Sequence, residues 1–185
     1  QRQMCIRDSS KITSLIDDSS LFSQFQKCRY SYLGEVESEE LLLRGSQSPS
    51  SLIIVNKKAT ARQLFQKCGG KKYHLSTYMT SFDTKKVLRE IRKELKLLEE
   101  EYPNYENVPE ERRVTIISTS LIEAGVDLDV YTVFRERAGL DSILQAGGRC
   151  NREGRRKKAD VFIFDLAEQT KKASSDERAN LTKGL

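Results

Sequence analysis

Three polar side chains within residues 141–154 have the spacing of a single helical stripe. They are Gln145, Arg149 and Arg152, which follow one another after four and then three residues. Because residues at these spacings lie on the same side of a helix, a helix here would present one amide and two guanidinium groups together. A guanidinium group stays protonated and offers a rigid fork of donors to phosphate oxygens. The pattern therefore indicates an anion-binding face, with solvated surface arginines as the alternative.

The opposite side of the same helix is predicted to pack on a core. At about 100° of rotation per residue, that side carries Leu140, Ile143, Leu144, Gly147 and Cys150. Gly147 is followed by Gly148, and a glycine inside a helix costs about 1 kcal/mol relative to alanine. Such a cost is tolerated where a backbone must come close to another group, so the pair predicts a close approach at this point.

A run of hydroxyl side chains follows a predicted strand at residues 114–117. The run is Ser118, Thr119 and Ser120. In an open parallel sheet, ligands bind at the carboxyl ends of the strands, and hydroxyl and N–H groups in a tight turn suit a phosphate oxygen. A Ser/Thr turn without a ligand is the alternative.

Two carboxylates come next along the chain. Asp127 and Asp129 alternate with apolar residues, so both can point to one side of an extended segment. Gly125, just before them, permits close approach of the backbone to a ligand. Carboxylates in this place could accept hydrogen bonds from ribose hydroxyls, and aspartates that only cap a turn are the alternative.

Short apolar runs predict the strands that position these side chains. Buried strands are expected at residues 52–55, 73–76, 114–117, 130–134 and 161–164. A helix is expected at residues 59–67, and the capping box Thr80-x-x-Asp83 opens a longer helix that extends to about residue 101. Strands that alternate with helices form βαβ units, so the predicted fold class is α/β with a mostly parallel sheet.

The predicted domain covers residues 48–168. Residues 1–47 are assigned to a lead-in or inter-domain segment, with a short edge strand at residues 30–33 and a helix that starts at Ser38. Residues 169–185 form a polar tail that is expected to fray.

The composition excludes several classes of protein. No apolar run approaches the roughly 20 residues that span a membrane. Four cysteines without a C-x-x-C pair argue against a zinc site and a disulfide framework, and they fit the reducing cytoplasm. The net charge of +5 is compatible with a polyanion partner without establishing one.

Two motifs carry a resemblance to a known superfamily. The series T-x-x-x-x-x-G-x-D followed by Q-x-x-G-R-x-x-R resembles motifs V and VI of superfamily 2 helicases. Its residues here are Thr119, Gly125, Asp127, Gln145, Gly148, Arg149 and Arg152. The longer strings ISTSLIEAGVDLD and LDSILQAGGRCNREG resemble the CRISPR-associated helicase–nuclease of type I systems. SLIIVN and YHLSTYM resemble further segments of that family, so the resemblance extends from residue 51 to about residue 166.

The resemblance implies the second RecA-like domain of an ATP-driven motor that translocates on single-stranded DNA. It implies that Arg149 and Arg152 act as arginine fingers on the γ-phosphate of ATP, and that Gln145 positions phosphate or the attacking water. Gly125, Asp127 and Gly148 would then line the nucleotide side of the cleft between two RecA-like domains. Contacts to the DNA backbone are implied for Ser118, Thr119, Asn56, Ser76 and Thr77.

The motifs that are missing from the sequence sharpen this expectation. There is no G-x-x-x-x-G-K-[ST] phosphate loop and no Asp-Glu-x-His/Asp run. The Mg²⁺ ligands are therefore expected in the first RecA-like domain of the same protein, and this chain alone is not expected to hydrolyse ATP. The one histidine, His74, cannot supply the family's HD nuclease and is predicted to be structural.

Other functions remain open from the residues alone. A CRISPR surveillance complex is a partner only through the family resemblance, and an RNA helicase or restriction translocase could share the two motifs. A non-catalytic nucleic-acid-binding module is the alternative from another class, and the intact Gln145, Arg149 and Arg152 argue against it. For the basic residues that follow Arg152, including Arg156, a solvated turn is expected, with contact to DNA phosphate as the alternative.

Overall fold

The computed structural model describes residues 28–76, 79–120, 126–152, 154, 156 and 159–168. Within them the chain forms, in order, β1 (Cys28–Val36), α2 (Ser38–Gln47), β2 (Ser50–Val55), α3 (Lys58–Lys67), β3 (Lys71–Leu75), α4 (Ser81–Glu101), two 3-10 turns (Pro103–Tyr105 and Glu110–Arg112), β4 (Val114–Thr119), β5 (Thr132–Glu136), α5 (Leu140–Gly147) and β6 (Ala159–Leu166).

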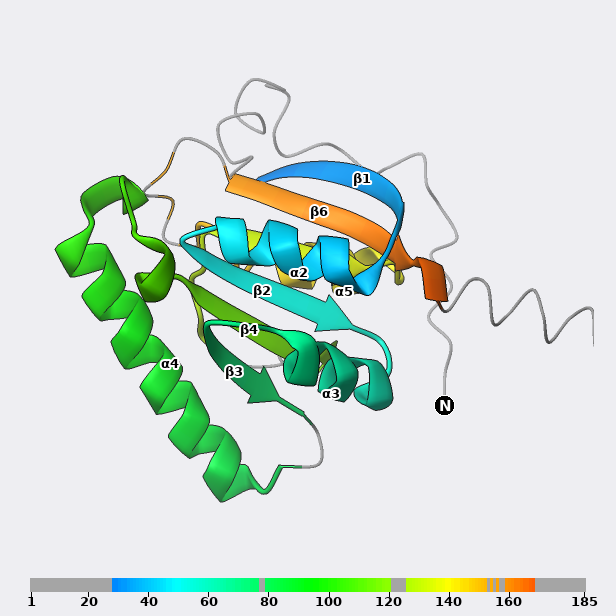
Figure 1. Cartoon of the computed structure of the whole chain (residues 1–185), viewed down its shortest axis with the longest axis horizontal. Coiled ribbons are helices and arrows are strands. Elements are labelled where there is room, and N and C mark those ends of the chain that lie inside the picture. Colours follow the sequence, from blue (N-terminus) through cyan, green and yellow to red (C-terminus); the bar gives the residue numbers. More distant parts are fainter. Residues whose placement is uncertain are drawn as a thin grey trace, which may run out of the picture.

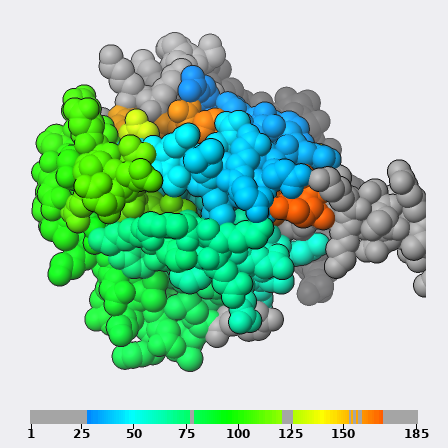
Figure 2. Space-filling model, in the orientation of Figure 1, coloured from blue at the N-terminus to red at the C-terminus, as the bar shows by residue number. Residues whose placement is uncertain are grey.

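The described strands form one six-stranded sheet in the order β1-β6-β5-β2-β4-β3, and every neighbouring pair is parallel. Helices cover both faces, which confirms the predicted α/β class (Figure 1). In the space-filling view, α2 (cyan) and α3 cover the near face and α4 (green) lies along one side (Figure 2).

The central strand β2 is buried on both faces because its side chains alternate between two cores. Leu52 and Ile54 pack with Ile91 of α4 on one face. Ile53 and Val55 pack with residues of α2 and α3 on the other. The short β-branched run therefore predicted the strand correctly, and the alternation divides its contacts between the two helical layers.

Helix α4 begins where the capping box placed it. The Asp83 backbone N–H donates to Thr80 Oγ1 at 3.1 Å, which satisfies one of the free donors of the first turn. Its apolar stripe is buried at Leu88, Ile91, Leu95 and Leu98. This stripe fixes the helix against the sheet. None of the described helices is long and apolar enough to span a membrane.

The segment that was predicted as a lead-in is part of the sheet from residue 28 onward. Strand β1 pairs with β6 from Cys28↔Ala159 to Val36↔Leu166, with an irregularity between Tyr32 and Glu35. The predicted edge strand at 30–33 is confirmed and is longer than expected. Residues 28–47 thus belong to the folded domain, because β1 pairs with β6. That pairing joins segments far apart in the sequence and could not be predicted from local composition.

Strand β5 begins two residues later than predicted. Val130 forms an isolated parallel bridge with Cys150, and the Tyr131 backbone N–H donates to Ser50 Oγ at 2.9 Å. These contacts satisfy the backbone before β5 joins its neighbours β2 and β6, so residues 130 and 131 lead into the strand rather than belonging to it.

Candidate nucleotide and nucleic-acid sites

The helix predicted to carry Gln145, Arg149 and Arg152 in one stripe ends before the arginines. Helix α5 stops at Gly147, and Gly148 caps it by donating to the Leu144 carbonyl at 2.9 Å. Arg149 and Arg152 lie in the turns that follow. The predicted helical stripe is therefore wrong beyond Gln145, since adjacent glycines favour the end of a helix over its continuation.

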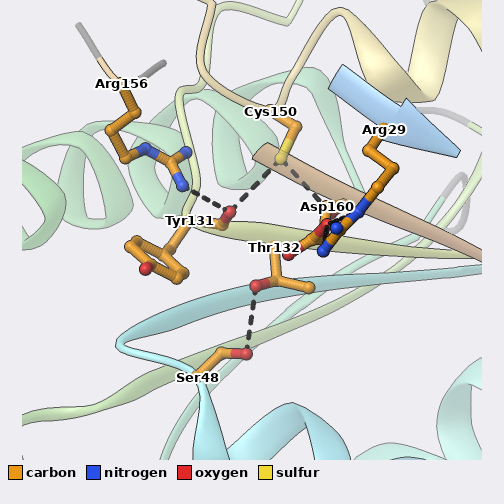
Figure 3. Close-up of polar contacts among 7 residues, drawn as sticks. All are labelled: Arg29, Ser48, Tyr131, Thr132, Cys150, Arg156 and Asp160. Atoms are coloured by element: carbon orange, nitrogen blue, oxygen red, sulfur yellow. Dashed lines mark hydrogen bonds and ion pairs between the residues drawn. The ribbon is translucent and has the colours of Figure 1, made fainter. Parts of the chain in front are cut away.

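The turn after α5 is tied to the start of β5 and β6. The Val130 backbone N–H donates to the Arg149 carbonyl at 2.9 Å. The Cys150 side chain is buried, and its sulfur lies 3.3 Å from the Tyr131 carbonyl and 3.5 Å from the Asp160 carbonyl (Figure 3). Cys150 thus packs into the core, as the sequence predicted, and it anchors the turn that carries the arginines.

The surroundings of the Cys150 thiol favour its protonated form. Its pKa lies far above the ordinary value because of a hydrogen bond to the Cys28 side chain and burial. A thiol held protonated in this way is a poor nucleophile, which agrees with a packing role.

Gly147 confirms the predicted close approach. A Cβ at this position would lie 2.8 Å from Cζ of Tyr30 on β1 and closer still to its hydroxyl. The neighbouring Cys28 thiol donates to the Gly147 carbonyl at 3.4 Å and to the Cys150 carbonyl at 3.1 Å. The edge strand β1 therefore packs directly against the turn that follows α5.

The predicted core side of α5 is only partly correct. Gly147 and Cys150 are buried, but Leu140 and Leu144 are 69% and 51% exposed. The side of α5 that meets the sheet is formed by Ala146 and Gly147, whose small size lets the helix lie close to the strands. The larger leucines consequently face outward.

Arg152 and Asp127 form an ion pair, which brings residues of the two motifs together. The Arg152 Nη1 atom lies 3.1 Å from Asp127 Oδ1, and both side chains remain substantially exposed. The pKa of Arg149 is lowered by burial and by the nearby Arg152 charge, while Asp127 opposes this effect. Arg149, Arg152 and Asp127 consequently interact electrostatically. Gly125 lies outside the described residues, and Gly148 is exposed at the end of α5.

A cavity of about 530 Å³ lies beside this ion pair. Asp127, Asp129 and Arg152 line it together with Arg92, Lys96 and Tyr105. It lies between the second half of α4 and the segment that precedes β5. The mixture of cationic and anionic groups can bind a polar ligand that carries both phosphate and hydroxyl groups.

These residues lie toward the amino-terminal edge of the sheet, where β5 begins. In the sequence, Asp127 and Asp129 follow the hydroxyl run that leaves the carboxyl end of β4, and the structure separates them from that run. Between Thr119 and Val130 the chain returns to the other edge, as the Val130–Cys150 bridge and the Tyr131–Ser50 hydrogen bond demonstrate. A parallel connection requires this return, because β4 and β5 run in the same direction.

The candidate DNA-binding residues lie at the opposite, carboxyl edge. Asn56, Ser76 and Thr119 stand at the ends of β2, β3 and β4. Ser118 and Thr119 are buried, and Ser118 Oγ donates to the Thr119 carbonyl at 2.8 Å. Among the described residues, Thr119 Oγ1 is buried without a hydrogen-bond partner. Thr77 lies outside the described residues.

Asn56 is held by the end of β5. Its Nδ2 donates to the Arg137 carbonyl at 2.9 Å, and its Oδ1 accepts from Arg135 Nη1 at 2.8 Å. Its backbone N–H donates to Glu136 Oε2 at 2.7 Å. The side-chain amide is thereby occupied within the protein, so Asn56 orders the carboxyl edge whatever else it contacts.

Arg135 and Glu136 are polar residues of this edge that the sequence reasoning missed. They are 2% and 7% exposed, which is rare for charged side chains and requires partners. Arg135 donates to Asn56 and to the Glu136 carbonyl, both at 2.8 Å. The available signal was a pair of charges that directly continues the apolar strand run Val133-Phe134.

Arg156 was predicted to be solvated, and the structure corrects this. Its guanidinium donates to the Tyr131 carbonyl at 2.9 Å and lies 4.3 Å from the centre of the Tyr131 ring (Figure 3). It also donates to the Val130 carbonyl at 2.9 Å. The two carbonyls belong to the segment that leads into β5, where Val130 forms only an isolated bridge with Cys150. The arginine therefore adds hydrogen bonds to backbone groups that lie outside the continuous strand pairing.

His74 lies on β3 with its ring stacked on Phe65 of α3 at 5.2 Å. Burial lowers the pKa of the imidazole. Within the described part of the chain, no group of three His, Cys, Asp or Glu side chains could hold a metal ion.

Comparison with known proteins identifies the family. Residues 47–155 match the model described as CRISPR-associated nuclease/helicase Cas3, C-terminal. The CRISPR-associated nuclease/helicase Cas3 of Haloferax volcanii is 51% identical over 63 residues, which are 33% of this chain and 7% of that protein.

Solved structures agree on the fold. The crystal structure of T. fusca Cas3-AMPPNP matches with a TM-score of 0.58 and 16% identity over 76% of this chain and 18% of that chain. S. cerevisiae Dbp5 bound to RNA and ADP BeF3 matches with a TM-score of 0.55 and 18% identity over 76% of this chain and 36% of that chain. The chain therefore spans a small part of its relatives, and it belongs to the family of Cas3-like C-terminal domains, with the RecA-like fold of a helicase motor domain.

Proposed function

We propose that this domain is the second motor domain of an ATP-dependent superfamily 2 DNA helicase or translocase of the type I CRISPR interference system. The observation that carries the proposal is the ion pair between Asp127 and Arg152, with Arg149 in the same electrostatic cluster. Three residues from two motifs, separated in the chain by β5 and α5, converge on one surface beside a cavity.

The proposed ligand of this surface is ATP held mainly by another domain. Arg149 and Arg152 supply permanent positive charge and forked donors for the γ-phosphate, where charge spreads over oxygens during phosphoryl transfer. Asp127 accepts from the ribose hydroxyls, and Gly125, Gln145 and Gly148 complete the nucleotide side.

Magnesium is assigned to the first RecA-like domain. The described residues contain no cluster of carboxylates able to hold it. Mg²⁺ held there would neutralise part of the charge on the phosphate groups. The proposed role of this chain is to orient Arg149 and Arg152 toward the γ-phosphate.

The carboxyl edge is proposed to contact the backbone of single-stranded DNA. Thr119 is assigned to this surface by its place at the end of β4; its Oγ1 is buried and has no hydrogen-bond partner among the described residues. Ser118, Asn56, Ser76 and Thr77 complete this edge, with Asn56 acting largely through the network with Arg135. The nucleotide and DNA surfaces are then at opposite ends of one sheet, so a rigid domain can link ATP turnover to movement along a strand.

The experiment joins this chain to the first RecA-like domain of the same protein and measures ATP hydrolysis with and without single-stranded DNA. We expect DNA-stimulated hydrolysis that Arg152→Ala lowers about 10³-fold, as for other arginine fingers. DNA binding should be largely retained. Normal ATP turnover by Arg152→Ala would contradict the assignment of Arg152 as an arginine finger.

The same assay separates the other candidates. Stimulation by RNA in place of DNA would indicate an RNA helicase. Nucleic-acid binding with no hydrolysis in the joined protein would indicate a binding module. The proposed partner complex is tested separately, by recruitment of the full-length protein to a CRISPR surveillance complex on target DNA.

A further inference from the structure

Arg92 contacts the candidate nucleotide surface from outside the two motifs that contain Asp127 and Arg152. It lies in the middle of α4, and its Nε donates to the main-chain carbonyl of Asp127 at 2.9 Å. The preceding residue, Ile91, is fully buried in the core beneath α4. The base of the Arg92 side chain is therefore held in a fixed position relative to the sheet.

Asp127 is restrained from two directions. Its carbonyl accepts from Arg92, and its carboxylate Oδ1 lies 3.1 Å from Arg152. Val126 and Leu128, on either side of it, are 8% and 2% exposed. With both neighbours buried and the carbonyl bonded, the direction in which the Asp127 carboxylate leaves the backbone is defined.

We propose that Arg92 is a positioning residue for ATP turnover: it holds the Asp127 main chain so that the carboxylate keeps Arg152 in its working place. The inference rests on the proposed function, because it concerns the same arginine finger. Arg92 donates to the Asp127 main chain, so its proposed action on Arg152 runs through Asp127.

A contribution to the stability of the fold does not by itself account for the ion pair between Asp127 and Arg152. The Asp127 and Arg152 side chains are 68% and 44% exposed. Ion pairs at such exposure contribute little to the stability of the fold. Their effect on the placement of a catalytic group can be much larger, because a shift of about 1 Å can cost about 10²-fold in rate.

Arg89 provides a matched control on the same helix. It is exposed, like Arg92, and its Nε donates to the Lys85 carbonyl at 3.3 Å, one turn back within α4. Replacing Arg89 by alanine therefore removes the same charge and the same side chain from the same helix, without removing a contact to Asp127.

The test compares Arg92→Ala, Arg92→Lys and Arg89→Ala in the protein joined to its first RecA-like domain. We expect Arg92→Ala to lower kcat about 10-fold or more and to change KM for ATP much less, because Arg152 acts on the transition state. Arg92→Lys should recover part of the loss, since an ammonium group can also donate to the carbonyl. Arg89→Ala should behave like the unchanged protein.

A double-mutant cycle tests whether Arg92 acts through Asp127. In a background that already carries Asp127→Ala, adding Arg92→Ala should lower kcat less than about 2-fold. Additive losses would overturn the proposal, and so would equal turnover by Arg92→Ala and Arg89→Ala.

Two further measurements keep the outcomes distinct. Melting temperatures of the variants report on folding, and Arg92→Gln, which keeps the methylene groups, replaces the alanine variant if that one melts early. An Arg152→Ala arm tests the proposed function itself. If that arm loses turnover and Arg92→Ala does not, only the positioning role is wrong.

Discussion

Asp127 and Arg152 lie 3.1 Å apart, although β5 and α5 separate them in the chain. The contact does not form within a single helix, strand or turn. The contact forms because the segment before β5 and the turn after α5 meet at the amino-terminal edge of the sheet, where Val130 and Cys150 form a bridge. A pair of motifs is thereby assembled into one charged surface.

Asp127→Asn tests whether this ion pair serves activity or stability. Because both side chains are well exposed, we expect the free energy of unfolding to change by less than about 1 kcal/mol. ATP hydrolysis by the protein joined to its first RecA-like domain should fall about 10-fold or more, as the amide holds Arg152 weakly. Urea unfolding and steady-state kinetics measure the two effects, and a large loss of stability with normal kinetics would contradict the expectation.

Gly147→Ala tests the close approach of β1 to the end of α5. The added Cβ overlaps the Tyr30 ring, so we expect a loss of about 1–3 kcal/mol in the free energy of unfolding. Tyr30→Ala in the same chain should relieve much of the overlap. Gly139→Ala is the control, because no atom lies within 4 Å of a Cβ built there. Equal stability of the Gly147 and Gly139 variants would refute the packing argument.

Asn56→Ala should destabilise the domain through Arg135. The variant removes the acceptor that Arg135 Nη1 uses at 2.8 Å, and loss of a partner by a buried charged group costs about 1–3 kcal/mol or more. Gln63→Ala, which removes an exposed amide from α3, should change stability by less than about 0.5 kcal/mol. Denaturant unfolding compares the two variants. If they match, the network at the carboxyl edge does not stabilise the fold.

His74 predicts a pH dependence of stability. Burial lowers the pKa of its imidazole in the folded state, while the unfolded state keeps a value near 6.5. The unfolded chain therefore binds a proton first as the pH falls, and stability that is present above about pH 6.5 is lost below it. His74→Gln should remove this part of the loss. The difference in free energy of unfolding between the two proteins, measured from pH 7.5 to pH 5, should then vary with pH; a constant difference would exclude the effect.

Local patterns were sufficient for most of the elements. The β-branched run at Leu52–Val55 predicted a strand buried on both faces, and Thr80 with Asp83 predicted the start of α4. These signals succeed because burial and capping depend on residues that are neighbours in the chain. The role of residues 28–47 could not be predicted in the same way, since β1 is identified by its distant partner β6.

The same distinction between local patterns and distant contacts applies to the candidate site. The sequence by itself determined which residues carry the motifs. Guanidinium, carboxylate and hydroxyl groups at those spacings predict binding to phosphate and ribose groups without further information. It also indicated, through Gly147, that a backbone must approach another group closely. The sequence could not predict where α5 ends. In the structure the helix ends at Gly147, so Arg149 and Arg152 lie in the turns that follow, and Leu140 and Leu144 face outward.

Only the tertiary structure decided where the two sets of residues lie. Asn56, Ser76 and Thr119 stand at the carboxyl edge of the sheet, and Asp127 with Arg152 stands toward the amino edge. A parallel sheet returns the chain to its starting edge between strands, so residues close in sequence on either side of a connection end at opposite edges. Contacts such as Arg92 to Asp127 follow from that return, and no spacing within the sequence encodes them.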